Sequence, residues 1–181
     1  MVVLQYASEN ASGETIFEDS SQIYANIVEI FALLNEHCLL DHTSIIYHGF
    51  SMGSARSFEI ALLDRAADGA HIFSSFISDS GTGFAEYNGQ LPPMLQAAGT
   101  DAYEGAHFWL YCGGQDHDGQ TCRDMEKMER FIVSHGGTVD AFNEYPQGGH
   151  GIFSTVNPGN GRSNTELAAM LDYIDSIGNE R

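Results

Sequence analysis

Short apolar runs rich in β-branched and aromatic residues recur along the chain and alternate with longer stretches of mixed polarity. Runs of this kind, bounded by glycine and polar residues, are typical of strands. Strands are predicted at residues 2–6, 44–47, 71–77, 108–112 and 139–145. Most of them are almost continuously apolar, which is expected of strands that are covered on both faces of a sheet.

The stretches between these runs have helical periodicity. Apolar side chains repeat at intervals of three and four residues in the stretches 23–34, 125–132 and 167–174. A further helix is predicted at 54–63, and residues 82–105 are expected to form an irregular loop or a short helix over the site. Parallel strands need crossover connections, which helices supply. The sequence therefore predicts an α/β fold, a mostly parallel sheet flanked by helices, in a single domain over residues 1–181.

The junction between the strand 44–47 and the helix after it carries the pattern Gly-x-Ser-x-Gly. In this pattern a strained turn exposes the serine hydroxyl above the carboxyl edge of a sheet. Ser51 is the candidate nucleophile, and Gly49 and Gly53 are expected to give the turn its room. The backbone N–H of Met52, at a helix N-terminus, is the candidate donor to an oxyanion.

A serine hydroxyl needs a base within hydrogen-bond reach and a carboxylate that orients the base. Two later strands end in glycine-rich loops that carry such groups, Asp116 after one and His150 after the next. Because parallel strands end at one edge, both loops should meet Ser51. Asp118 shares the first loop and is the alternative acid, and His117 is the closest competitor of His150.

The loop from Asp116 to Gly119 weakly resembles a calcium-binding loop. The pattern fails at Gln120, where a further acidic ligand is required, and no glutamate follows at the spacing of a bidentate ligand. No metal and no cofactor are therefore expected to take part in the reaction.

The chain is strongly acidic, with 25 acidic and 7 basic residues and a formal net charge of −18. Such a surface repels phosphate backbones and anionic lipids, so we expect no nucleic-acid partner and no membrane partner. Solubility or adaptation to salt explains the acidity. No apolar run approaches the ~20 residues that cross a bilayer.

The three cysteines are too few for a disulfide framework. One bridge, most plausibly between Cys112 and Cys122, fits an exported protein, and free thiols in a reducing cytosol fit equally well. The sequence leaves the compartment open.

The motif at 49–58, together with the loops around Asp116 and His150, resembles the esterase D and feruloyl or acetyl-xylan esterase group of α/β-hydrolases. The resemblance implies cofactor-free hydrolysis of small acyl esters, free or linked to plant polysaccharide, through an acyl-enzyme. It implies a triad of Ser51, Asp116 and His150, with Met52 as one oxyanion donor. Three aromatic residues are expected to contact the substrate: Phe50, Phe84 and Tyr87.

The start of the chain departs from this group, whose members have further strands and an oxyanion loop before the segment that resembles 2–38. The chain is expected to be either a fragment or a minimal form. In the minimal form, strand 2–6 pairs with 44–47 and the loop 7–10 supplies the second donor. In a fragment, strand 2–6 is an open edge that favours self-association. A catalytically weak or silent binding domain is the alternative function.

Overall fold

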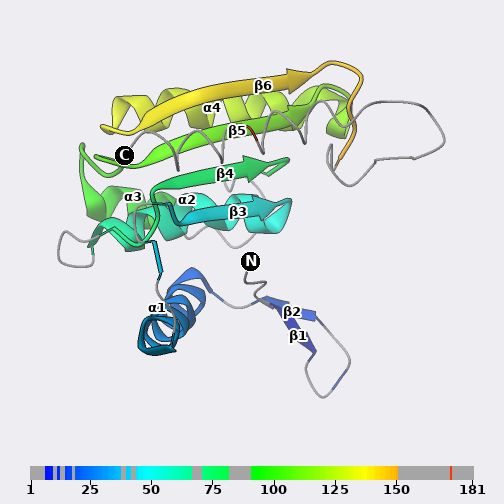
Figure 1. Ribbon diagram of the computed structural model, residues 1–181. Coiled ribbons are helices and arrows are strands. Elements are labelled where there is room, and N and C mark those ends of the chain that lie inside the picture. Colours follow the sequence, from blue (N-terminus) through cyan, green and yellow to red (C-terminus); the bar gives the residue numbers. More distant parts are fainter. Residues whose placement is uncertain are drawn as a thin grey trace. The chain divides into compact units, whose positions relative to one another are not determined.

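The computed structural model describes residues 7–9, 12, 15–17, 19–37, 40–41, 44–66, 71–81, 91–150 and 172 (Figure 1). The predicted strand 2–6 and nearly all of the predicted helix 167–174 lie outside these residues. The chain divides into two compact units, Met1–Leu40 and Asp41–Arg181, and each is described by itself. None of the described helices is long and apolar enough to cross a membrane.

The first unit contains a short hairpin and a helix. Strands β1 (Ala7–Glu9) and β2 (Thr15–Phe17) pair antiparallel, and α1 spans Ser20–His37. Asp19 caps α1, because its Oδ1 accepts a hydrogen bond of 2.9 Å from the N–H of Gln22. The helix confirms the predicted apolar stripe. The loop expected at 7–10 is wrong for residues 7–9, which form strand β1 and pair with β2.

The second unit is built on a four-stranded parallel sheet with the strand order β3-β4-β5-β6. The strands span Ile46–Phe50, Ser75–Asp79, His107–Gly113 and Thr138–Tyr145, respectively. The predicted parallel α/β sheet is confirmed. Within the described part of the chain β3 pairs only with β4, and the pairing of strand 2–6 with β3 remains a prediction.

The helices described beside the sheet are α2 (Met52–Ala66), α3 (Leu91–Ala98) and α4 (Gln120–Ser134). Figure 1 shows α2 behind β3 and β4, and α4 behind β5 and β6, on one face of the sheet. Neighbouring strands that follow one another in sequence, joined by right-handed crossovers, place their helices on the same face. The short 3₁₀ helix η1 (Asp116–Gly119) lies between β5 and α4.

Aromatic side chains fill the space between this face and α2. The rings of Phe58 and Phe76 stack on Phe108 with centroids 5.7 and 5.2 Å away, and Tyr103 meets Phe108 edge-on. All four side chains are fully buried. Burial of this kind contributes roughly 1.5–3 kcal/mol for each large apolar side chain, so the core fixes α2 and the turn that precedes it.

Strand β4 begins later than the predicted start at residue 71. The N–H groups of Ile72 and Phe73 donate to the buried Asp64 carboxylate of α2, at 2.9 and 3.2 Å. Because this side chain takes the donors that would otherwise join a ladder, regular pairing starts at Ser75. The second predicted strand, 44–47, is likewise displaced to Ile46–Phe50.

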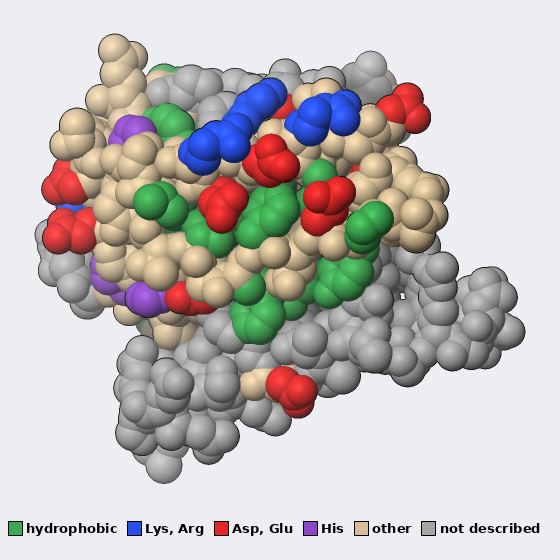
Figure 2. Space-filling model, turned by 90° about the horizontal axis from the view of Figure 1, so that it is seen from above, with side chains coloured by type: hydrophobic (Ala, Val, Ile, Leu, Met, Phe, Trp, Pro, Cys, Tyr) green, Lys and Arg blue, Asp and Glu red, His purple; other side chains and the backbone are tan. Residues whose placement is uncertain are grey.

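Basic side chains gather along the exposed side of α4, where Figure 2 shows them among acidic neighbours. Lys127 lies 2.6 Å from Asp124, and Arg130 lies 3.9 Å from Glu126 of the same helix. Pairs of this kind at three- and four-residue spacing neutralise charge locally. The absence of nucleic-acid partners stays a prediction.

Candidate active site

Ser51 lies in the sharp turn between β3 and α2. Its backbone is left-handed, with φ of 54°, a conformation that costs a non-glycine residue about 1–2 kcal/mol. The surroundings hold it there: the Ser51 N–H donates to the Asp79 carbonyl at 2.8 Å, and the Ser51 carbonyl accepts from Ala55 in α2 at 3.1 Å. The turn has the strand-to-helix geometry that the motif predicts.

The two motif glycines differ in importance. A Cβ at Gly49 would overlap the carbonyl of Gly53, whereas a Cβ at Gly53 would meet nothing within 4 Å. The turn therefore requires a residue without a side chain at Gly49, as expected, because the backbone of Gly53 occupies the space that a Cβ would need. The same expectation is wrong for Gly53, where a Cβ would have free space.

Gly49→Ala should therefore lower the free energy of unfolding by about 2–3 kcal/mol, because the backbone of the turn must shift to accept a methyl group. Gly53→Ala is the matched control and should change stability by less than about 1 kcal/mol. Urea unfolding of both variants measures the difference. Equal effects would contradict the steric role assigned to Gly49.

Backbone hydrogen bonds tie the loops at the carboxyl edge of the sheet to one another. The Ser80 N–H donates to Tyr111 at 3.0 Å, joining the end of β4 to β5. The N–H of Gly114 donates to Tyr145 and that of Gln115 to Gly148, both at 2.8 Å, joining the loop after β5 to the end of β6 and to the loop that follows β6. The edge is therefore a connected frame, and it fixes the distances between side chains that lie far apart in sequence.

This frame brings Ser51, His150 and Asp116 into one hydrogen-bonded chain. His150 Nε2 lies 2.9 Å from Ser51 Oγ, and His150 Nδ1 lies 2.9 Å from Asp116 Oδ2. Asp116 is buried and His150 is exposed to solvent. A buried carboxylate at Nδ1 favours the tautomer in which Nε2 accepts the serine proton.

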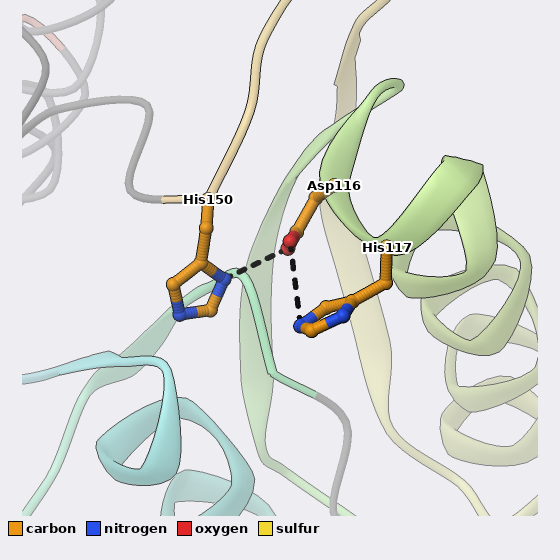
Figure 3. A group of neighbouring side chains, drawn as sticks. All are labelled: Asp116, His117 and His150. Atoms are coloured by element: carbon orange, nitrogen blue, oxygen red, sulfur yellow. Dashed lines mark hydrogen bonds and ion pairs between the residues drawn. The ribbon is translucent and has the colours of Figure 1, made fainter.

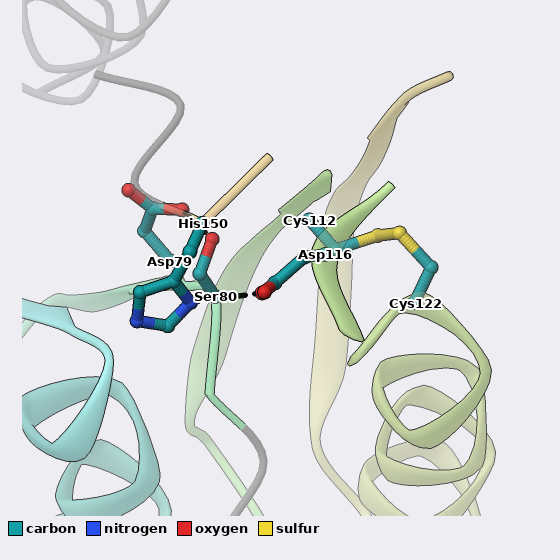
Figure 4. The surroundings of a disulfide bond; sticks show 6 residues. All are labelled: Asp79, Ser80, Cys112, Asp116, Cys122 and His150. Atoms are coloured by element: carbon teal, nitrogen blue, oxygen red, sulfur yellow. Dashed lines mark hydrogen bonds and ion pairs between the residues drawn. A yellow bond between two sulfur atoms is a disulfide. The ribbon is translucent and has the colours of Figure 1, made fainter. Parts of the chain in front are cut away.

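The same geometry distinguishes the two acids of the loop. Asp116 faces the His150 ring, whereas Asp118 is exposed and its carbonyl accepts a hydrogen bond from Arg123 at 3.2 Å. A disulfide joins Cys112 at the end of β5 to Cys122 in the first turns of α4 (Figure 4). This bridge, one of the alternatives left open by the sequence, closes the segment that carries Asp116.

The other predicted site residues are only partly described. Phe50 is 39% exposed, and its ring centroid lies 5.0 Å from that of His150, so it lies beside the ring that contacts Ser51. Met52 is the first residue of α2, where backbone N–H groups have no partner within the helix. Phe84 and Tyr87 lie outside the described residues, and their substrate contacts remain predictions.

Sequence reasoning did not single out Asp79 at the end of β4. Its side chain is 1% exposed and lies near His150 and Asp116 (Figure 4). Burial raises the pKa of Asp79 to about 6, against the opposing effects of a 2.7 Å hydrogen bond from Ser80 and of the His150 charge. The available signal was its position, at the carboxyl end of the strand beside the nucleophile strand.

The raised pKa predicts how stability depends on pH. Between about pH 4 and pH 6 the folded protein holds a proton on Asp79 that the unfolded chain has lost, so stability falls as pH rises through this window. Asp79→Asn should raise the free energy of unfolding by up to about 3 kcal/mol at pH 8 and change it little at pH 4. Urea titrations at both pH values test this. An equal gain in the free energy of unfolding at both pH values would show that the substitution acts through packing and not through the charge of Asp79.

No protein-family model matches the sequence, and no curated protein is similar to it. Solved structures are similar in fold. An esterase of the fungus Rhizomucor miehei is 14% identical, with a TM-score of 0.65 over 94% of this chain and 61% of its own. A carboxylesterase from Lactobacillus plantarum is 16% identical, with a TM-score of 0.63 over 88% of this chain and 67% of its own.

A fluorophosphonate-binding serine hydrolase from Staphylococcus aureus is 15% identical, with a TM-score of 0.54 over 97% of this chain and 67% of its own. The strand order and these similarities show the α/β-hydrolase fold. The chain spans 61% of the length of the fungal esterase.

Proposed function

We propose that the chain hydrolyses small acyl esters through an acyl-enzyme on Ser51. The observation that carries the proposal is the continuous chain of hydrogen bonds from Ser51 through His150 to Asp116, with 2.9 Å at each step. A serine, an imidazole and a buried carboxylate at these distances are the parts that nucleophilic acyl transfer requires.

The reaction begins when His150 Nε2 takes the Ser51 proton as Oγ attacks the ester carbonyl. The Asp116 carboxylate stabilises the imidazolium that forms. The backbone N–H of Met52 is the proposed donor to the oxyanion of the tetrahedral intermediate. His150 then gives its proton to the leaving alcohol, and a water activated by the same ring hydrolyses the acyl-enzyme.

The surroundings of Ser51 favour a substrate with an apolar acyl group. The exposed ring of Phe50 stands beside His150, and such a ring can pack against an aliphatic or aromatic acyl chain. Feruloyl or acetyl esters of plant polysaccharide are the finer proposal, which rests on the motif resemblance. The esterase descriptions of the Rhizomucor and Lactobacillus proteins support ester hydrolysis in general terms.

Two measurements test the proposal on the full chain. A panel of p-nitrophenyl esters with methyl ferulate should give turnover with at least one short acyl chain. A fluorophosphonate probe, the kind of reagent that the Staphylococcus protein binds, should label Ser51 in folded protein. Folded protein that neither labels nor turns over any ester would overturn the proposal in favour of a silent binding domain.

A further inference from the structure

A second histidine, His117, faces the proposed catalytic acid beside His150, with the two ring centroids 5.9 Å apart. His117 Nε2 lies 3.7 Å from Asp116 Oδ1, while His150 Nδ1 lies 2.9 Å from Asp116 Oδ2. One ligand atom from each of the three side chains lies within 4.8 Å of the others. Figure 3 shows both rings turning a nitrogen toward the same carboxylate.

The backbone places His117 there at a cost. His117 and Asp118 both have left-handed conformations, with φ of 46° and 56°. Each such residue costs about 1–2 kcal/mol, and two in succession are uncommon outside glycine. The side chain of His117 is 75% exposed, and the proposed mechanism of ester hydrolysis does not use it.

We propose that Asp116, His117 and His150 bind Zn²⁺, and that the bound ion inhibits the hydrolase. Two imidazoles and one carboxylate form a three-ligand set that zinc accepts, with the fourth position open to water. The inhibitory part rests on the proposed function, and the metal site itself does not.

The fit requires only a small movement. Zinc-to-ligand distances of about 2.0–2.2 Å place the ligand atoms of a tetrahedral site roughly 3.3 Å apart. His150 Nδ1 and Asp116 Oδ2, at 2.9 Å, must move slightly apart to reach this spacing. His117 Nε2, at 3.7 Å from Asp116 Oδ1, must move slightly closer to the carboxylate. Since His117 is mostly exposed, its ring can rotate toward the carboxylate without displacing packed atoms.

Inhibition follows from the position of one proton. As a base, His150 carries its single ring proton on Nδ1 and offers the lone pair of Nε2 to the Ser51 hydroxyl. Zinc binds the lone pair of Nδ1, so the ring proton must move to Nε2 through solvent. Nε2 then donates a hydrogen bond and can no longer accept the serine proton. The ion also neutralises the Asp116 carboxylate.

The first experiment measures zinc binding without using activity. The full chain, freed of metal with a chelator, is titrated with ZnCl₂ in competition with a chromophoric chelator. We expect one ion per chain and an affinity that falls about 100-fold in His117→Gln. His107→Gln is the matched control, because His107 also faces a carboxylate, Asp140 at 3.2 Å, and has no second imidazole in its pair. Equal zinc affinity in wild type and His117→Gln would overturn the site.

The second experiment measures inhibition, with each variant normalised to its own zinc-free rate. Zinc should inhibit the wild type and the His107→Gln variant at similar concentrations, and EDTA should restore the rate. Inhibition of His117→Gln should need about 100-fold more zinc. Identical inhibition of the two histidine variants would overturn the proposed mechanism. If no ester is hydrolysed at all, the proposed function fails, and the binding titration still decides the metal site.

Discussion

Ser51→Ala should lower ester turnover by about 10⁴-fold or more, to the level that binding and oxyanion stabilisation alone support. The physical reason is that no other hydroxyl stands at hydrogen-bond distance from His150 Nε2 in the described residues. The variant should also fail to react with a fluorophosphonate probe. Initial rates with the best p-nitrophenyl ester, measured over a range of enzyme concentrations, give the ratio.

The same substitution should leave the free energy of unfolding within about 0.5 kcal/mol of the wild type, because the Ser51 side chain is partly exposed and adds little packing. The matched control is Ser134→Ala on the exposed part of α4, which should keep full activity. Activity retained above about one part in a hundred in Ser51→Ala, with no loss of fold, would contradict the nucleophile assignment.

The sequence was informative where chemistry and local backbone requirements coincide. A serine between glycines at a strand-to-helix junction needs the sharp turn that the structure contains, and the periodicity of α4 follows from its buried stripe. Parallel order then implied that loops after successive strands meet at one edge. The distances of 2.9 Å on both sides of His150 were beyond sequence reasoning, because the backbone bonds between loops set them.

Other features depend on contacts that leave no local signal. Asp64 delays the start of β4 by accepting two backbone N–H bonds across a loop, and no pattern in 71–77 indicates this. The burial of Asp79 depends on how the ends of three strands pack. Contacts distant in sequence decided each case.

Asp79 also affects the interpretation of the catalytic acid. It is a second buried carboxyl near His150, and at pH 8 it is mostly ionised because its pKa is about 6. An ionised Asp79 can therefore stabilise the His150 imidazolium through space, although the hydrogen bond to Nδ1 belongs to Asp116. When the Asp116 charge alone is removed, ionised Asp79 should still stabilise the His150 imidazolium above pH 6, and this stabilisation should weaken below pH 6.

The second large effect is expected for His150→Ala and Asp116→Asn. His150→Ala should be about as damaging as loss of Ser51, because it removes the only base in contact with Oγ in the described part of the site. Asp116→Asn should lower turnover by about 10³–10⁴-fold, since an amide can donate to Nδ1 and turn the ring proton toward Ser51. Steady-state rates at pH 8 measure both.

Asp118→Asn is the matched control for the acid, because it makes the same change two residues further along the same loop. Asp118 is exposed and Asp116 is buried against His150, so Asp118→Asn should change turnover by less than about 2-fold. Turnover of the two variants measured over pH 5 to 9 distinguishes two effects of Asp116, its orientation of the His150 ring and its negative charge. A wrong tautomer lowers the rate at every pH, whereas a missing charge mainly shifts the pH profile. If Asp118→Asn proved the more damaging variant, the acid would have to be reassigned to Asp118 and the contact between Asp116 and His150 would lose its proposed role.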